Sequence, residues 1–257
     1  MIKIGRSSNP ALSNKTFINA ANTATTEEVM TLNGAVNKTF LMLALVVGAA
    51  VYTWNLFYKS IDPETGTVTG NVMRWIIGGS IGGFIVALVT IFKKTWSPYS
   101  APIYAILEGL FLGALSAYFN AMYPGIVFNV VLLTFGILFF MLFLYKSRII
   151  KPTENFKLGV FAATGGIFFV YLISWILRLF GVSVGFIHDS GPIGIGFSLV
   201  VVVIASLNLV LDFDFIEQGA EQGAPKYMEW YSAFGLMVTL IWLYLELLRL
   251  LAKLSRR

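Results

Sequence analysis

The chain of 257 residues contains no cysteine and few charged side chains. The absence of cysteine excludes disulfides, thiolate metal sites and cysteine nucleophiles. Charged residues make up only 12% of the chain, whereas 57% of its residues are hydrophobic. A single soluble core cannot bury that much apolar surface, so lipid must cover the remainder. The composition therefore indicates a membrane protein.

Apolar runs of about 20 residues, the length that crosses roughly 30 Å of hydrocarbon as a helix, recur along almost the whole chain. The joins between them are too short to hold a soluble domain. We predict a polar N-terminal tail, residues 1–38, mobile or interfacial, and one transmembrane domain, residues 39–257. The domain is predicted to be an all-α, polytopic seven-helix bundle with spans at residues 39–58, 72–92, 101–120, 125–145, 158–180, 193–215 and 229–252.

The basic residues give a net charge of +5, but they stand singly or in pairs between the apolar runs. This distribution is typical of topology signals and not of a nucleic-acid partner. The positive-inside rule favours a cytoplasmic N-terminus, although seven spans then place Arg256 and Arg257 on the opposite side. In a six-span alternative, residues 212–227 form a re-entrant segment and both ends are cytoplasmic. We prefer seven spans.

Four carboxylates lie within or at the ends of predicted spans, namely Glu108, Asp212, Asp214 and Glu246. A bare charge at the centre of a spanning helix costs roughly 2.5–3.5 kcal/mol on insertion scales. Each group must therefore be paired, protonated or hydrated, and an interfacial position or a local ion pair is the simplest solution. For Glu246 that solution is available, because Arg249 lies one turn away as an ion-pair partner. A structural and a functional role carry equal weight there.

Asp212 and Asp214 are two residues apart, so their side chains point about 200° away from each other around a helix. Asp212 follows the apolar run Ser198–Leu211, whereas Asp214 is one step nearer to Glu217 and Glu221. We predict that Asp212 is the buried member. Desolvation and neighbouring cations shift the pKa of a buried carboxyl group in opposite directions, which makes such a group a candidate for titration near neutral pH.

Glu108 shares its predicted helix with small residues that suit close packing, among them Gly109 and Gly113. We expect its side chain to face the interior of the bundle. Interior carboxylates at Glu108, Asp212 and Glu246 would supply the oxygen ligands that suit Ca²⁺ and for which protons compete. Ca²⁺ or H⁺ is expected as a transported ion, with any Ca²⁺ site near Asp212, and no cofactor is predicted.

Signatures of an enzyme are weak. The single histidine, His188, stands beside Asp189 in a predicted loop, where a solvated pair is far more common than a catalytic dyad. The chain has no His-Glu-x-x-His motif, and it lacks the two aspartates in glycine-containing contexts that an intramembrane aspartyl protease needs. We therefore do not expect catalysis.

Several stretches of the chain resemble the Bax inhibitor-1 superfamily, specifically its bacterial YccA-like branch. The most specific lie near the C-terminus: Leu207–Glu217 (LNLVLDFDFIE), Gly223–Tyr231 (GAPKYMEWY) and Trp242–Leu251 (WLYLELLRLL). Further resemblance runs through Ser8–Ser13, Met30–Gly34, Trp96–Pro98, Ala101–Tyr104 and Glu108–Gly113, and so covers nearly the whole chain.

The resemblance implies a seven-helix membrane protein whose characterised relatives act as pH-sensitive calcium leak channels, gated by an aspartate pair between the last two helices. Asp212 resembles the first member of that pair. Alignment on the final Arg249–Leu251 puts Thr239, or its neighbour Met237, where the second aspartate would stand. The chain therefore departs from the family at the gate.

Two hypotheses follow for the function of the chain. The leading one is a pH-modulated leak for cations, in particular Ca²⁺, across the bacterial inner membrane, with Asp212 as the proton-sensitive group. Glu108, Glu246 and Asp214 are secondary candidates. Either Glu108 or Glu246 replaces the missing aspartate, or the two-aspartate latch is absent. The rival is a non-conducting regulator, because the resemblance also implies modulation of a membrane-bound ATP-dependent protease or a stress-response partner. Under both hypotheses the lipid bilayer surrounds the chain. The sequence leaves the oligomeric state open and is compatible with a monomer.

Overall fold

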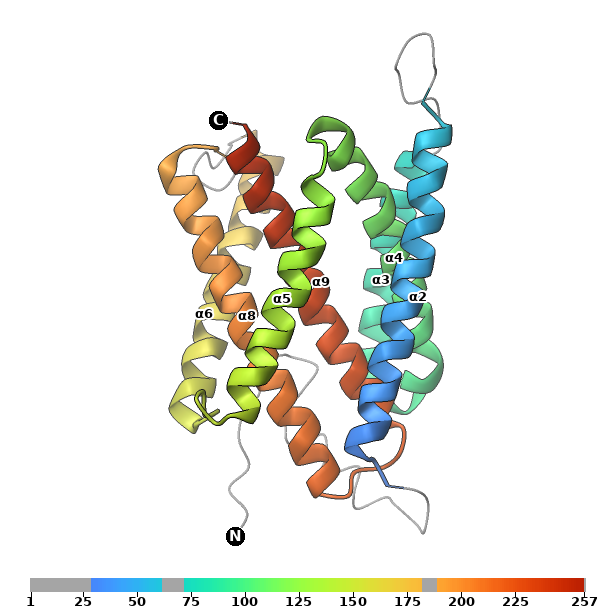
Figure 1. Cartoon of the computed structure of the whole chain (residues 1–257), viewed down its shortest axis with the longest axis vertical. Helices are drawn as coiled ribbons and strands as arrows, with labels where there is room; N and C mark the ends of the chain where they lie inside the picture. Colours follow the sequence, from blue (N-terminus) through green and yellow to red (C-terminus); the bar gives the residue numbers. More distant parts are fainter. Residues whose placement is uncertain (1–28, 62–71, 182–188, 257) are drawn as a thin grey trace. The chain divides into compact units, whose positions relative to one another are not determined.

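The computed structural model describes residues 29–61, 72–181 and 189–256, so the predicted tail up to residue 28 and His188 lie outside the described residues. That part of the chain forms seven long helices and a single 3-10 turn (Figure 1). Its β-structure is limited to an isolated bridge. The predicted all-α class is confirmed. The helices are α2 (Leu32–Lys59), α3 (Val72–Phe92), α4 (Ser97–Met122), α5 (Ile126–Lys146), α6 (Glu154–Leu179), α8 (Pro192–Glu221) and α9 (Met228–Ser255), and η1 (Lys94–Trp96) precedes α4.

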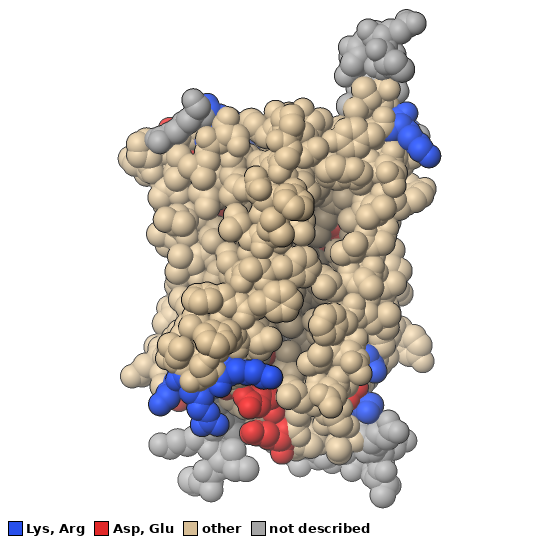
Figure 2. All heavy atoms as spheres, viewed as in Figure 1, with Lys and Arg blue, Asp and Glu red and all other residues tan. Residues whose placement is uncertain are grey.

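All seven helices are long and apolar enough to cross a membrane. Large apolar side chains are exposed along them, for example Phe84 on α3 at 63% and Phe168 on α6 at 60%. On the face drawn in Figure 2, uncharged residues cover most of the surface over the helices, and charged side chains gather near helix ends. Lipid is the solvent that suits such a surface.

Two helices extend six or seven residues beyond their predicted spans, α2 at its start and α8 at its end. Helix α2 begins at Leu32, inside the residues predicted as tail, because Thr31 caps it and accepts a hydrogen bond from the backbone N–H of Gly34. Helix α8 continues without a break from Asp212 to Glu221. The six-span alternative required that segment to re-enter the membrane, so the seven-span arrangement is the one observed.

The described residues form two compact units. One unit holds α2, α3, η1 and α4 together with residues 216–237, which comprise the end of α8 and the start of α9. The other unit holds α5 from Phe128 onward, α6, α8 up to Phe215 and α9 from Val238 onward.

Close contact between α2 and α4 depends on glycines of α4. A Cβ atom on Gly109 would lie 2.4 Å from the carbonyl oxygen of Val46. A Cβ atom on Gly113 would lie 2.1 Å from the carbonyl oxygen of Ala50 and 2.3 Å from Oγ1 of Thr53. The two backbones therefore touch, as the predicted small-residue face requires.

Replacement of Gly113 by alanine should destabilise the α2–α4 pair by about 1–3 kcal/mol, because the added methyl group meets backbone and not a movable side chain. Thermal unfolding of the purified protein in detergent measures the effect. The matched control is Gly48→Ala on α2, where a Cβ atom meets nothing within 4 Å. Equal unfolding temperatures for the two variants would contradict the close approach.

Candidate functional site

Asp212 and Asp214 on α8 lie in different surroundings. Asp212 is 1% exposed, whereas the side chain of Asp214 is 14% exposed and lies 2.7 Å from Nζ of Lys157. The predicted order of burial is confirmed. Lys157 was predicted to lie just before a span, but it belongs to the first turn of α6 and its side chain is only 7% exposed. Its ion pair with Asp214 explains how a lysine is buried there.

Polar side chains recur on one face of α6, at Lys157, Thr164 and Tyr171. Positions seven residues apart share a helix face, about 10 Å from one to the next. Lys157 pairs with Asp214, and Thr164 Oγ1 accepts a hydrogen bond of 2.8 Å from Nδ2 of Asn208. These contacts join α6 to α8 at two depths.

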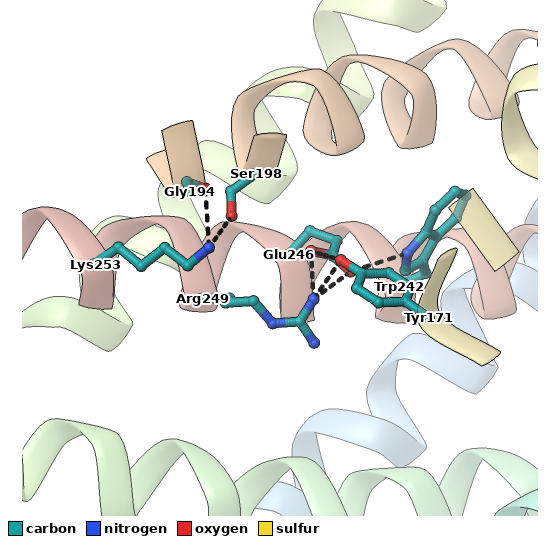
Figure 3. Close-up of polar contacts among 7 residues, drawn as sticks. All are labelled: Tyr171, Gly194, Ser198, Trp242, Glu246, Arg249 and Lys253. Carbon is teal, nitrogen blue, oxygen red and sulfur yellow. Dashed lines mark hydrogen bonds and ion pairs between the residues drawn. The ribbon is translucent and has the colours of Figure 1, made fainter. Parts of the chain in front are cut away.

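Glu246 on α9 forms the centre of a third polar contact (Figure 3). Nη1 of Arg249 lies 2.9 and 2.8 Å from the two carboxylate oxygens, so the predicted ion pair is confirmed. The hydroxyl of Tyr171 accepts a hydrogen bond of 2.6 Å from Arg249 and donates to the carboxylate at 3.1 Å. The indole N–H of Trp242 donates at 3.3 Å. The carboxylate, in a residue 2% exposed, is thus well satisfied.

Lys253 extends the polar contacts of α9 to the start of α8. Its Nζ donates to the carbonyl oxygen of Gly194 and to Oγ of Ser198, both at 2.9 Å (Figure 3). The residue is 3% exposed. The distribution of basic residues predicted only topology signals, but Lys253 is buried and its hydrogen bonds connect α9 to α8.

Glu108 lies on α4 against α3. A Cβ atom on Gly83 would be 2.5 Å from its Oε1, so glycine makes room for the carboxylate. The side chain is half-buried, and within the described residues it forms no hydrogen bond or ion pair. It belongs to a different compact unit from Asp212 and Glu246, and the expected convergence of the three carboxylates stays a prediction.

The two positions at which the resemblance places a second gate aspartate carry no charge. Thr239 and Met237 on α9 are 4% and 1% exposed. Among the described residues, no three His, Cys, Asp or Glu side chains lie together as a metal site.

Sequence reasoning missed several residues that make polar contacts, among them Tyr171, Lys253 and Glu229. Tyr171 stands inside an apolar run, where a hydroxyl needs a partner, and that signal was available. Glu229 was taken as the first residue of a span, yet it is 0% exposed and hydrogen-bonded to Thr31. No spacing rule connects residues so far apart in sequence.

Removal of the Arg249 cation should destabilise the protein because it leaves Glu246 buried and uncompensated. We expect Arg249→Met to cost roughly 2–3 kcal/mol, below the ~3–5 kcal/mol of a fully buried pair, since the side chain of Arg249 is 38% exposed. Thermal unfolding in detergent measures the loss.

The double variant Arg249→Met with Glu246→Gln should recover much of that stability, because the buried charge is gone. Arg178→Met, at the exposed end of α6, is the control. Strict additivity in the double variant, or equal effects of the two arginine substitutions, would refute the pairing.

Comparison with known proteins places these features in a family. A sequence model described as Bax inhibitor 1 like matches residues 9–256, nearly the whole chain. Comparisons with curated proteins and with solved structures found no match. The superfamily expected from the sequence is confirmed, whereas the YccA-like branch stays a prediction. The chain is an integral membrane protein that belongs to the Bax inhibitor 1 like family.

Proposed function

We propose that the chain is a pH-modulated cation leak, conducting Ca²⁺ across a bacterial cytoplasmic membrane, with its N-terminus in the cytoplasm. The observation that carries the proposal is the burial of Asp212. This carboxyl group is 1% exposed on a helix that is apolar for most of its length. Ionisable groups inside spanning helices are rare and mark ion or proton paths.

Two of the other carboxylates have a cation directly beside them. Asp214 is held by Lys157, and Glu246 is held by Arg249 and Tyr171. A carboxylate that already has a cation at 2.7–2.8 Å makes a poor site for a transported ion. These two residues are therefore assigned to the scaffold, and Glu108 is the second candidate for the path.

The mechanism requires that Asp212 exchanges a proton or a cation. In its charged form, the carboxylate offers oxygen ligands to Ca²⁺, and in its protonated form it does not. A change of charge in the low-dielectric interior also alters the forces between neighbouring spans. Proton concentration then controls both the affinity for the cation and the packing around it. No step involves catalysis or a cofactor.

Thr239 gives this chain a different response from that of a two-aspartate gate. Two close carboxylates titrate as a coupled pair in two macroscopic steps. A threonine hydroxyl can accept or donate a hydrogen bond but does not titrate in this range. The pH dependence of the gate itself should therefore follow a single proton, that of Asp212.

Flux measurements on the purified protein in vesicles, with an enclosed calcium dye, test the proposal. The native protein should admit Ca²⁺ at a rate that changes with pH, and Asp212→Asn should remove that change because it cannot titrate. Glu221→Gln, an exposed carboxylate on the same helix, should behave as the native protein does. Absence of flux at every pH would overturn the leak and favour a regulator that binds a membrane-bound ATP-dependent protease or a stress-response partner.

Thr239→Asp tests the single-proton response. The substitution adds a second carboxyl group at the family's gate position, so the profile of flux against pH should change from one step to two, or to one steeper step. Thr239→Asn has a similar size and no titration, and it should keep a single step. An Asp variant with an unchanged profile would show that position 239 takes no part in the gate.

A further inference from the structure

Glu229, on the first turn of α9, contacts Thr31, the N-cap residue of α2. Its Oε1 accepts two hydrogen bonds of 3.0 Å from Thr31, one from the backbone N–H and one from the side-chain hydroxyl. Thr31 in turn accepts a hydrogen bond of 3.0 Å from the backbone N–H of Gly34. Glu229 is 0% exposed, so these contacts are shielded from solvent.

The arrangement is a capping box whose acid comes from another helix. In a capping box, the N-cap threonine accepts from the third helical residue, whose glutamate accepts from the N–H of the N-cap residue. The third residue of α2 is Gly34, which has no side chain. A Cβ atom on Gly34 would lie 1.9 Å from Oε1 of Glu229. Glycine therefore leaves the space in which Glu229 completes the cap.

Residues next to Thr31 strengthen the connection. Val29 forms an antiparallel bridge with Pro225, and the N–H of Met30 donates to the carbonyl oxygen of Ala224 at 2.6 Å. The side chain of Met30 lies against Ser232, with 4.0 Å between Sδ and Oγ. The short segment before α2 is thus bound along the turn between α8 and α9.

Charges on both sides of Glu229 compensate for its burial. Nζ of Lys38 on α2 lies 3.7 Å from Oε2, and Nζ of Lys226 in the turn lies 3.4 Å from Oε1. The positive N-terminal ends of α2 and α9 also meet at this carboxylate. Removal of Glu229 would leave two helix ends and two lysines without their shared counter-charge.

We propose that Glu229 is a latch that couples the capping of α2 to the attachment of residues 29–31. The same oxygen, Oε1, completes the cap and holds the segment, so the two are lost together. Displacement of residues 29–31 therefore breaks a contact of α9, the helix that also carries Glu246. The latch is inferred from its own contacts and does not rest on the proposed cation leak.

Cross-linking tests the latch, because the chain has no cysteine of its own. Met30→Cys with Ser232→Cys places two thiols at the contact, and a short bifunctional thiol reagent reports their proximity in vesicles. Glu229→Ala should lower the cross-linked fraction, because the loss of a capping contact worth ~1 kcal/mol lowers the equilibrium constant for attachment about fivefold. Glu221→Ala, an exposed acid at the end of α8, should leave the yield unchanged.

Gly34→Ala tests the same contact without a change of charge. Its methyl group should displace the carboxylate and lower the yield as Glu229→Ala does. In the Glu229→Ala background, the space is vacant and Gly34→Ala should add no further loss. An unchanged yield in Glu229→Ala, or an equal effect of Gly34→Ala in both backgrounds, would overturn the latch.

A final variant separates the cap from the attachment. Gly34→Glu with Glu229→Ala restores a capping box within α2 but removes the connection to α9. Hydrogen exchange should then show native protection of the first-turn amides of α2, while the cross-linked fraction stays low. Recovery of the cross-link in this variant would show that helix capping alone positions the segment, and the latch would be rejected.

Discussion

The structure depends on one constraint, which is that lipid offers no partner to a charged or hydrogen-bonding side chain. Each buried polar group in these helices must therefore be satisfied by the chain itself. Lys157 with Asp214, Tyr171 with Glu246 and Arg249, and Lys253 with Ser198 are three such solutions. They join α6, α8 and α9 at separate points, so they fix the register of helices whose apolar surfaces alone would specify little.

Three carboxylates show the same constraint. Asp214, Glu246 and Glu229 are each held by a cation and belong to the scaffold. Asp212 and Glu108 are the groups to which we assign ion and proton exchange. Asp212 shares α8 with the scaffold residue Asp214, two residues away, whereas Glu108 lies on α4. A change of charge at Asp212 therefore acts on a helix that is already tied to its neighbours, which is the condition for a local event to alter helix packing.

Much of the fold was predictable because hydropathy reports on lipid contact, which is a local property of each segment. The seven spans and the burial of Asp212 follow from apolar runs, and the pairing of Glu246 with Arg249 follows from helical spacing. The start of α2 was missed although Thr31 is a local capping signal, and the acid that completes this cap, Glu229, lies 198 residues away in the sequence. The partner of Lys157 was hidden for the same reason: helix-to-helix contacts leave no periodic signal in one sequence. Gly34 is an example, because it matters by having no side chain where the carboxylate of Glu229 lies.

The proposed leak requires that the Asp212 carboxyl group changes its protonation while it is buried in the membrane. Infrared difference spectroscopy of the protein in lipid, native minus Asp212→Asn, observes this event directly across a range of pH. We expect a carboxylic-acid band that is absent from the variant and that changes over the same pH interval as the cation flux. A band that stays constant through that interval, or no band assignable to Asp212, would contradict it.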